Sequence, residues 1–91
     1  MPVLVPIGTS DTPSTEFTVT TGTEVFLFLV NEAGGNITPF ARADIQLKSS
    51  DGQWFNQVAL TGANPGSYLG AGGPYRVVRR RCDSAFGVEK A

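Results

Sequence analysis

The sequence predicts an all-β fold: a small antiparallel β-sandwich, Ig-like or jelly-roll-like, of six to seven short strands with an extended N-terminal arm. Turn-forming residues recur every ~8–12 residues, a spacing typical of sandwiches and barrels. Between the turns, several segments alternate apolar and polar residues with the period of two that a half-buried strand requires. No window repeats apolar residues at helical spacing without an intervening Gly or Pro.

The N-terminal segment, residues 1–16, is predicted to be the extended arm, and residues 17–91 the β-sandwich domain. Pro2, Pro6 and Pro13 lack a backbone N–H and bias the residue before each of them toward extended geometry. Four apolar side chains of the arm cannot bury one another: Val3, Leu4, Val5 and Ile7. They must therefore lie either against this domain or against a neighbouring subunit.

Residues 17–30 predict a first hairpin. Phe17 and Val19 alternate with threonines, a Thr-Gly turn signal follows, and residues 23–30 form the run with the highest β-propensity in the chain. The VFLFLV segment within that run is apolar at every position. This is typical of a central strand that is covered on both faces.

A loop at residues 31–39 leads to a second predicted hairpin at residues 41–60. In ARADIQLKS, strict alternation places one face of the strand in the core and the polar face in water. A Ser-Asp-Gly turn then leads to the partner strand QWFNQVAL. Trp54 and Phe55 point to opposite faces of that strand, so at most one lies in the core and the other marks a contact surface.

The segment at residues 61–74 is rich in glycine and irregular, with a short strand expected at residues 67–69. Its GAGGP sequence lacks the spacing of a dinucleotide loop or a P-loop, so it predicts a turn rather than a phosphate site. Residues 75–80 predict a further strand, and residues 85–89 a last short one.

Catalytic and metal chemistry have little support in the composition. The chain has no His, which removes the commonest general base and zinc ligand, and Cys82 is the only cysteine. The acidic residues lack the spacing of a calcium loop, and a paired-carboxylate glycosidase needs a cleft larger than this domain offers. We expect no enzyme activity, no metal and no cofactor. Cys82 is predicted to be a small buried hydrophobic residue near the last strands.

Charge bears on the class of partner. The net charge is −1 and charged residues make up 16% of the chain. Electrostatic nucleic-acid binders usually have a pI above about 9, so we expect no nucleic-acid partner. Low charge gives little repulsion between copies and so favours an assembled protein. No apolar run approaches the ~20 residues of a membrane helix, and the N-terminus lacks the basic region of a signal peptide, so no membrane partner is expected.

Four arginines fall within the six positions RVVRRR. In a strand, Arg79 and Arg81 share one face with Tyr75, whereas Arg76 and Arg80 share the other. The continuous basic stripe that a nucleic-acid surface needs is therefore missing. Two other interpretations stay open: pairing with Asp and Glu on adjacent strands, or pairing of the planar guanidinium groups with carboxylates of a neighbouring subunit.

A resemblance to small β-rich virion proteins of tailed phages rests on four segments, Phe17–Gly22, Asp44–Trp54, Gly73–Arg79 and Gly87-Val88. Those proteins show an opening F-T-V-x-x-G strand, a hairpin similar to v-x-I-Q-x-x-s-x-G-x-W, a late G-x-Y-R-V-x-R strand and a terminal G-V. The family suggested is the capsid decoration or cement proteins and similar small head proteins. The resemblance covers residues 17–88.

This resemblance implies a non-enzymatic structural protein of the virion, assembled in the host cytoplasm, that binds across capsid subunits and stabilises the head. The implied partners are the major capsid protein or another virion protein, and further copies of the chain in a dimer or trimer. We expect the interface to contain Val3, Leu4, Val5, Ile7, Trp54, Tyr75, Arg79, Arg80 and Arg81.

Two alternatives stay open. One is a neck or tail accessory protein. The other is a carbohydrate- or cell-surface-binding module that uses exposed aromatic side chains, namely Trp54, Tyr68 or Tyr75.

Overall fold

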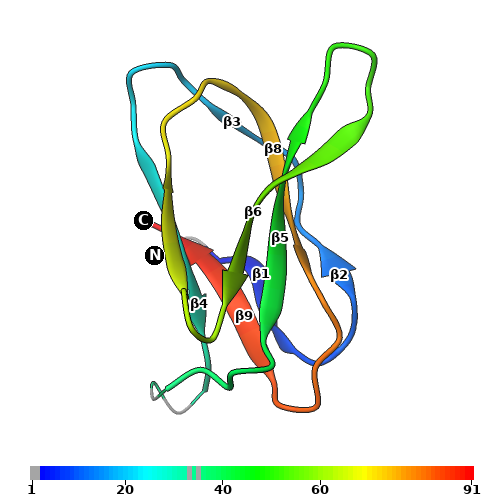
Figure 1. Ribbon diagram of the computed structural model, residues 1–91, viewed down its shortest axis with the longest axis vertical. Coiled ribbons are helices and arrows are strands. Elements are labelled where there is room, and N and C mark those ends of the chain that lie inside the picture. The colour runs from blue at the N-terminus through cyan, green and yellow to red at the C-terminus, as the bar shows by residue number, and fades with distance from the viewer. Residues whose placement is uncertain (1–2, 33, 35) are drawn as a thin grey trace.

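The computed structural model describes residues 3–32, 34 and 36–91. Within these residues the chain is all-β, with nine strands and no helix, in two antiparallel sheets (Figure 1). The four-stranded sheet has the order β1 (Val3–Gly8), β9 (Phe86–Lys90), β4 (Val25–Val30) and β7 (Gly66–Leu69). The five-stranded sheet has the order β2 (Thr12–Pro13), β8 (Gly73–Arg79), β5 (Arg42–Lys48) and β6 (Trp54–Thr61), with β3 (Phe17–Val19) also paired to β8.

The two sheets share one hydrophobic core. Leu27, Phe86 and Val88 come from the four-stranded sheet, and Ile45 and Val77 from the five-stranded sheet; all five are fully buried or nearly so. These residues alternate along their strands with residues that face away from the core, as the period of a strand requires. The inner faces of both sheets are therefore used for folding, and their outer faces remain for other contacts.

The second predicted hairpin is confirmed. β5 and β6 pair from Arg42 opposite Thr61 to Lys48 opposite Trp54, and the turn between them contains Gly52 at φ +90°. Figure 1 shows the two strands, in green, joined at the top of the view. The short strands expected at residues 67–69, 75–80 and 85–89 are also present, as β7, β8 and β9.

The polar face of β5 differs from the prediction that it lies in water. Asp44 and Gln46 point away from the core and are nevertheless buried. Arginine side chains from β5 and from the β8 segment lie against them and exclude the solvent. The alternation assigned the correct face to each residue, but it did not reveal that long neighbouring side chains cover that face.

The first predicted hairpin is wrong. β3 pairs with β8 in the five-stranded sheet, whereas β4 pairs with β7 and β9 in the four-stranded sheet. The turn exists, with Gly22 at φ +90°, but it carries the chain from one sheet to the other. β4 is internal in its sheet as expected, yet only one of its faces is covered: Leu27 and Leu29 are buried, whereas Phe26 and Phe28 are partly exposed.

The segment expected to be an extended arm contributes a strand to each sheet. β1 pairs with β9, and β2 pairs with β8. Pro6 lies at an irregularity of the β1–β9 register and Pro13 in an edge strand, the two settings in which a sheet accepts proline. These two strands raise the count above the expected six to seven. Residues 1–2, 33 and 35 lie outside the described residues, and with them Pro2 and part of the expected loop at 31–39.

Candidate binding surfaces

The four apolar residues of the N-terminal segment have different environments. Val5 is fully buried in the core, and Leu4 packs partly buried against it. Val3 and Ile7 are exposed. Of the two locations that the sequence left open, this domain's own core therefore accounts for Val5 and Leu4, and only Val3 and Ile7 offer surface to a partner.

Arg79 is buried, with 4% of its area exposed, and it cannot reach a partner. Its guanidinium donates hydrogen bonds to the carbonyl oxygens of Pro6, Ser10 (3.0 Å) and Phe86 (3.4 Å), and to Oγ1 of Thr12 (2.9 Å). Burial lowers the pKa of Arg79. Arg79 therefore ties the N-terminal segment to β8 and β9. The burial of Arg79 agrees with strand periodicity, because Arg79 shares a face of β8 with the buried residues Tyr75 and Val77.

Tyr75 also belongs to the interior. Its ring is fully buried and stacks on Phe17 with 6.1 Å between ring centroids. Its hydroxyl donates to the carbonyl oxygen of Ala71 at 2.9 Å, which holds the glycine-rich turn against the sheet. A buried Tyr needs such an acceptor, and this one is met within the chain, so Tyr75 is a core residue and not a surface for sugars or protein.

Trp54, which was expected in the interface, lies on the outer face of the five-stranded sheet. It is half-buried on β6, with the Arg76 guanidinium 4.5 Å from its ring centroid and the Lys48 ammonium 5.7 Å away. Such cation–π contacts fix a side chain on the surface of a sheet. Phe55, the next residue, is exposed on the other face, where the end of the hairpin extends past the core.

Arg80 and Arg42 both form ion pairs with Asp44, one with each carboxylate oxygen. Nε of Arg80 lies 2.7 Å from Oδ2 of Asp44, and Nε of Arg42 lies 2.8 Å from Oδ1. This is the pairing with an acidic residue on an adjacent strand that the sequence left open as one interpretation. The β5–β8 register brings Arg42, Asp44 and Arg80 together. Asp44 lies opposite Val78, and Val78 is two residues from Arg80 on the same face of the strand.

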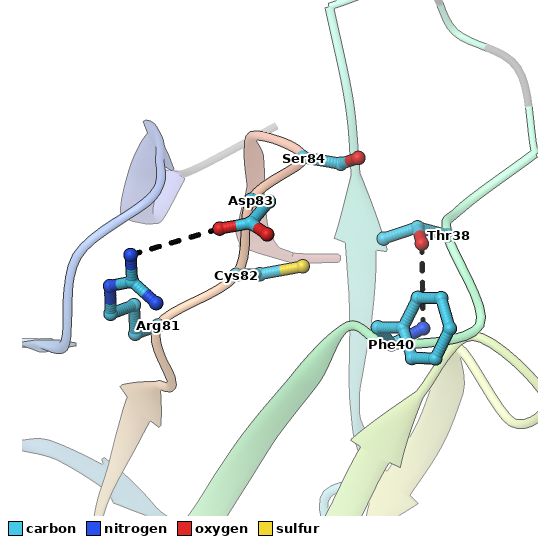
Figure 2. Close-up of a pocket in the computed structure, with 6 residues that line it drawn as sticks. All are labelled: Thr38, Phe40, Arg81, Cys82, Asp83 and Ser84. Carbon is cyan, nitrogen blue, oxygen red and sulfur yellow. Dashed lines mark hydrogen bonds and ion pairs between the residues drawn. The ribbon is translucent and has the colours of Figure 1, made fainter.

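Arg81 lies beyond β8 at one end of the two sheets. Its exposed guanidinium is 3.7 Å from Asp83, and its backbone N–H donates to Asp11 at 2.7 Å. Figure 2 shows the neighbouring pocket, in which the Cys82 side chain is directed toward Thr38 and Phe40. The pocket has a volume of about 220 Å³. Cys82 is buried, as the sequence predicted.

An aromatic surface that the sequence did not predict lies on the outer face of the four-stranded sheet. It is composed of Phe26, Phe28 and Tyr68, and we call it the aromatic face. The Phe26 ring centroid lies 5.6 Å from that of Phe28 and 4.7 Å from that of Tyr68. Tyr68 is 66% exposed. The sequence feature that indicates this surface is the VFLFLV segment, which is apolar on both faces. Both faces were expected in the interior, but the face with Phe26 and Phe28 points outward.

Gly66 is what allows the rings to lie close to the sheet. It pairs with Phe28, and the ring of Phe26 leans over it, so that a Cβ at position 66 would meet Cζ of Phe26 at 2.5 Å. A glycine covered by an aromatic ring on the adjacent strand is one of the devices that fix strand register in a sheet. The Phe26 ring therefore lies over Gly66, in contact with Tyr68 and Phe28 on either side.

No group of three or more His, Cys, Asp or Glu side chains in the described ranges is positioned to hold a metal ion. Those ranges also contain no helix with the length and hydropathy to cross a membrane. The chain matches no family model, no curated protein and no solved structure.

Proposed function

We propose that the protein is a non-enzymatic structural protein that functions by binding other protein subunits through the aromatic face. The supporting observation is the cluster of Phe26, Phe28 and Tyr68 on an open sheet face. A cluster of large aromatic side chains on the surface marks a contact more often than isolated apolar residues do. The proposed fold type is a β-sandwich, Ig-like or jelly-roll-like.

The physical advantage of such a contact is the removal of apolar area from water. Covering one large aromatic side chain contributes about 1.5–3 kcal/mol, and Tyr and Phe in well-packed pockets dominate many interfaces. An apolar sheet face can pack on a second sheet, with about 10 Å between the two. The exposed Val3 lies on the same face, but Glu89 of β9 separates it from Phe28, so the apolar surface is confined to the three aromatic residues.

The role that we propose is that of a capsid decoration or cement protein of a tailed phage. The support is the resemblance of residues 17–88 to small virion proteins, together with a face suited to subunit contacts. The partners would be the major capsid protein and further copies of this chain in a dimer or trimer. Binding across subunit boundaries stabilises a shell because separating the subunits must also break these contacts.

The test is self-association and head binding of Tyr68→Glu, which places a charge in the aromatic face. We expect the wild-type protein to sediment as a dimer or trimer and to cosediment with tailed-phage heads that lack their decoration protein. Tyr68→Glu should be monomeric and should not bind heads. Phe55→Glu is the matched control, because Phe55 is exposed to a similar degree outside the aromatic face. A wild-type protein that is monomeric and binds no heads would refute the proposal.

A carbohydrate-binding module is the second candidate, and the exposure of Tyr68 favours it. Sugar rings stack on exposed aromatic faces. Of the three aromatics named for this function, Tyr75 is buried and Trp54 already contacts Arg76. Binding of the purified protein to a glycan array, lost in Tyr68→Ala, would support this candidate against protein assembly.

A further inference from the structure

A second surface lies on the outer face of the five-stranded sheet, opposite the aromatic face. Arg42, Arg76 and Arg80 lie there together, and we call them the arginine strip. The backbone N–H of Arg80 donates to the carbonyl oxygen of Arg42 at 2.9 Å, so these two are direct neighbours. Arg76 lies four residues from Arg80 along the chain, about 13 Å in an extended strand. The strip therefore spans two adjacent strands and most of their length.

The guanidinium groups are held in position by acceptors beneath them. Nε of Arg42 and Nε of Arg80 donate to the two carboxylate oxygens of Asp44. Nε of Arg76 donates to Oε1 of Gln46 at 2.7 Å. The Asp44 side chain is only 3% exposed, whereas those of Arg42 and Arg80 are 55% and 41% exposed. The acceptors are thus covered, and the arginines form the surface.

Each of these arginines uses Nε for the inward bond. Within the described part of the chain, the hydrogen bonds of the three guanidinium groups are those made by Nε. The edge of the group formed by Nη1 and Nη2 matches the two oxygens of a carboxylate in a bidentate pair. A guanidinium that is already fixed loses less side-chain entropy on binding than a free one. The strip therefore has the geometry of a preorganised carboxylate receptor.

Trp54 supports one end of the strip. The Arg76 guanidinium lies over its ring, with Cζ 4.5 Å from the ring centroid, and Gln46 holds the same group from the side. Lys48 adds a further cation at this end, with Nζ 3.3 Å from Oε1 of Glu16. Stacking on an aromatic ring and one fixed Nε bond together leave the plane of the Arg76 group little freedom.

The charge of this face differs in sign from that of the rest of the protein. The three arginines and Lys48 carry four positive charges, and Asp44 and Glu16 carry two negative charges, so the face is +2. The whole chain has a net charge of −1, which leaves −3 for the remainder. A face of this sign complements an acidic partner, and charge complementarity raises the rate of encounter and sets the orientation of binding.

We propose that the arginine strip binds an acidic segment of a partner protein, with carboxylates paired end-on to Arg42, Arg76 and Arg80. Carboxylates are favoured over the phosphates of a nucleic acid, because each guanidinium edge matches one carboxylate, whereas a domain that binds nucleic acid usually has a pI above about 9 and this chain has a pI of about 5.1. This inference goes beyond the function proposed above, because it assigns a second partner surface on the opposite sheet. The protein would then join two partners.

The test is titration of the native protein with a synthetic peptide that alternates Glu and Thr, followed by NMR of the arginine Nε–H signals. Arg42→Lys, Arg76→Lys and Arg80→Lys keep the charge and remove the bidentate edge. We expect each substitution to weaken binding about threefold to fivefold, the upper part of the range for exposed ion pairs. Arg81→Lys is the matched control, because Arg81 is exposed and lies outside the strip; its affinity should equal that of the wild type.

Several outcomes would overturn this inference. They are no binding of the acidic peptide, equal affinity of the three Arg→Lys variants and the wild type, or tighter binding of a single-stranded oligonucleotide of matched charge. In the wild-type protein, the Nε–H signals of Arg42 and Arg80 must shift on addition of the peptide, and this readout requires no variant. Tyr68→Glu separates the two proposals, because it should abolish assembly through the aromatic face and leave peptide binding unchanged.

Discussion

Replacing Arg79 by Met tests whether this buried side chain holds the N-terminal segment in the fold. Met keeps the length of the apolar stem and removes the charge and all donors. In the wild type, the guanidinium donates to acceptors of Pro6, Ser10, Thr12 and Phe86, which come from four separate positions around β1, β2 and β9. The substitution leaves those acceptors without their donor.

The magnitude follows from two opposing contributions. A hydrogen bond from a charged donor contributes about 1.5–3 kcal/mol, and Arg79 makes four, one of them long at 3.4 Å. Against this, the group is buried among neutral acceptors, and the cost of desolvation offsets a large part of the gain. We expect Arg79→Met to lower the free energy of unfolding by about 3 kcal/mol. For a domain of this size the corresponding fall in Tm is about 12–24 °C.

The assay is urea unfolding followed by the fluorescence of Trp54, with hydrogen exchange of the β1 amides as a local readout. Gly8→Ala provides an independent perturbation, because its Cβ would lie 2.8 Å from Nη2 of Arg79 and displace the guanidinium. In a double-mutant cycle the two costs should not add, since each removes the same contacts. Arg81→Met is the exposed control. A cost below about 0.5 kcal/mol for Arg79→Met, or fully additive costs, would refute this account.

Three further outcomes are expected. Gly87→Ala should destabilise the fold by about 2 kcal/mol, because its Cβ would meet the carbonyl oxygen of Val5 at 2.6 Å and force β1 away from β9. Urea unfolding measures this change, and an unchanged midpoint would contradict the close packing of β1 on β9. The Ser49 hydroxyl donates to Asp51 and lowers the pKa of that carboxyl from 3.8, so Ser49→Ala should raise the Asp51 pKa in an NMR titration. Because the native pKa is the lower one, this stabilisation is present above the unfolded pKa and is lost as pH falls through the native value. The Cys82 thiol should react with an aromatic disulfide reagent far more slowly in the native protein than in urea, and equal rates would argue against its burial.

The second hairpin could be predicted from the sequence because all of its determinants are local. The Asp51-Gly52 turn, the alternation of β5 and the β-formers of β6 lie within residues 41–60, and the strands pair with each other. The bulge between Ile45 and Gln46 did not disturb the prediction, because it shifts the register within a pair already formed by the turn.

The first hairpin failed for a reason that no local pattern contains. A turn at Gly22 looks the same whether it joins two paired strands or carries the chain between sheets. The partners of β4 lie about 40 and 60 residues further along the chain, in β7 and β9. The N-terminal strands were missed for a related reason: Pro6 and Pro13 argue against central strands, and both occupy tolerated positions at an edge or an irregularity.

The candidate surfaces were predicted in part. The sequence correctly placed Arg79 on the same face of β8 as Tyr75. It did not show that this face is the buried one, so both residues were expected in the interface. The role of Arg42 and Asp44 beside Arg80 required the β5–β8 register, which the sequence does not specify. The aromatic face required knowing which side of β4 is covered, and that depends on the number of layers in the fold.

The late pairing of β4 has a consequence for how the protein is made. This strand is the most hydrophobic of the chain, and both of its neighbours, β7 and β9, are synthesised after it. Leu27 pairs with Lys90, which is synthesised roughly sixty residues later, or after about 3–12 s at common elongation rates. Until β7 is made, about forty residues after β4, both edges of this β-forming segment lack their partners, and until β9 is made one edge still does. An unpaired apolar strand is a target for chaperones and a nucleus for aggregation. Yield in the cell should therefore depend on translation speed between β4 and β9 as much as on the stability of the finished fold.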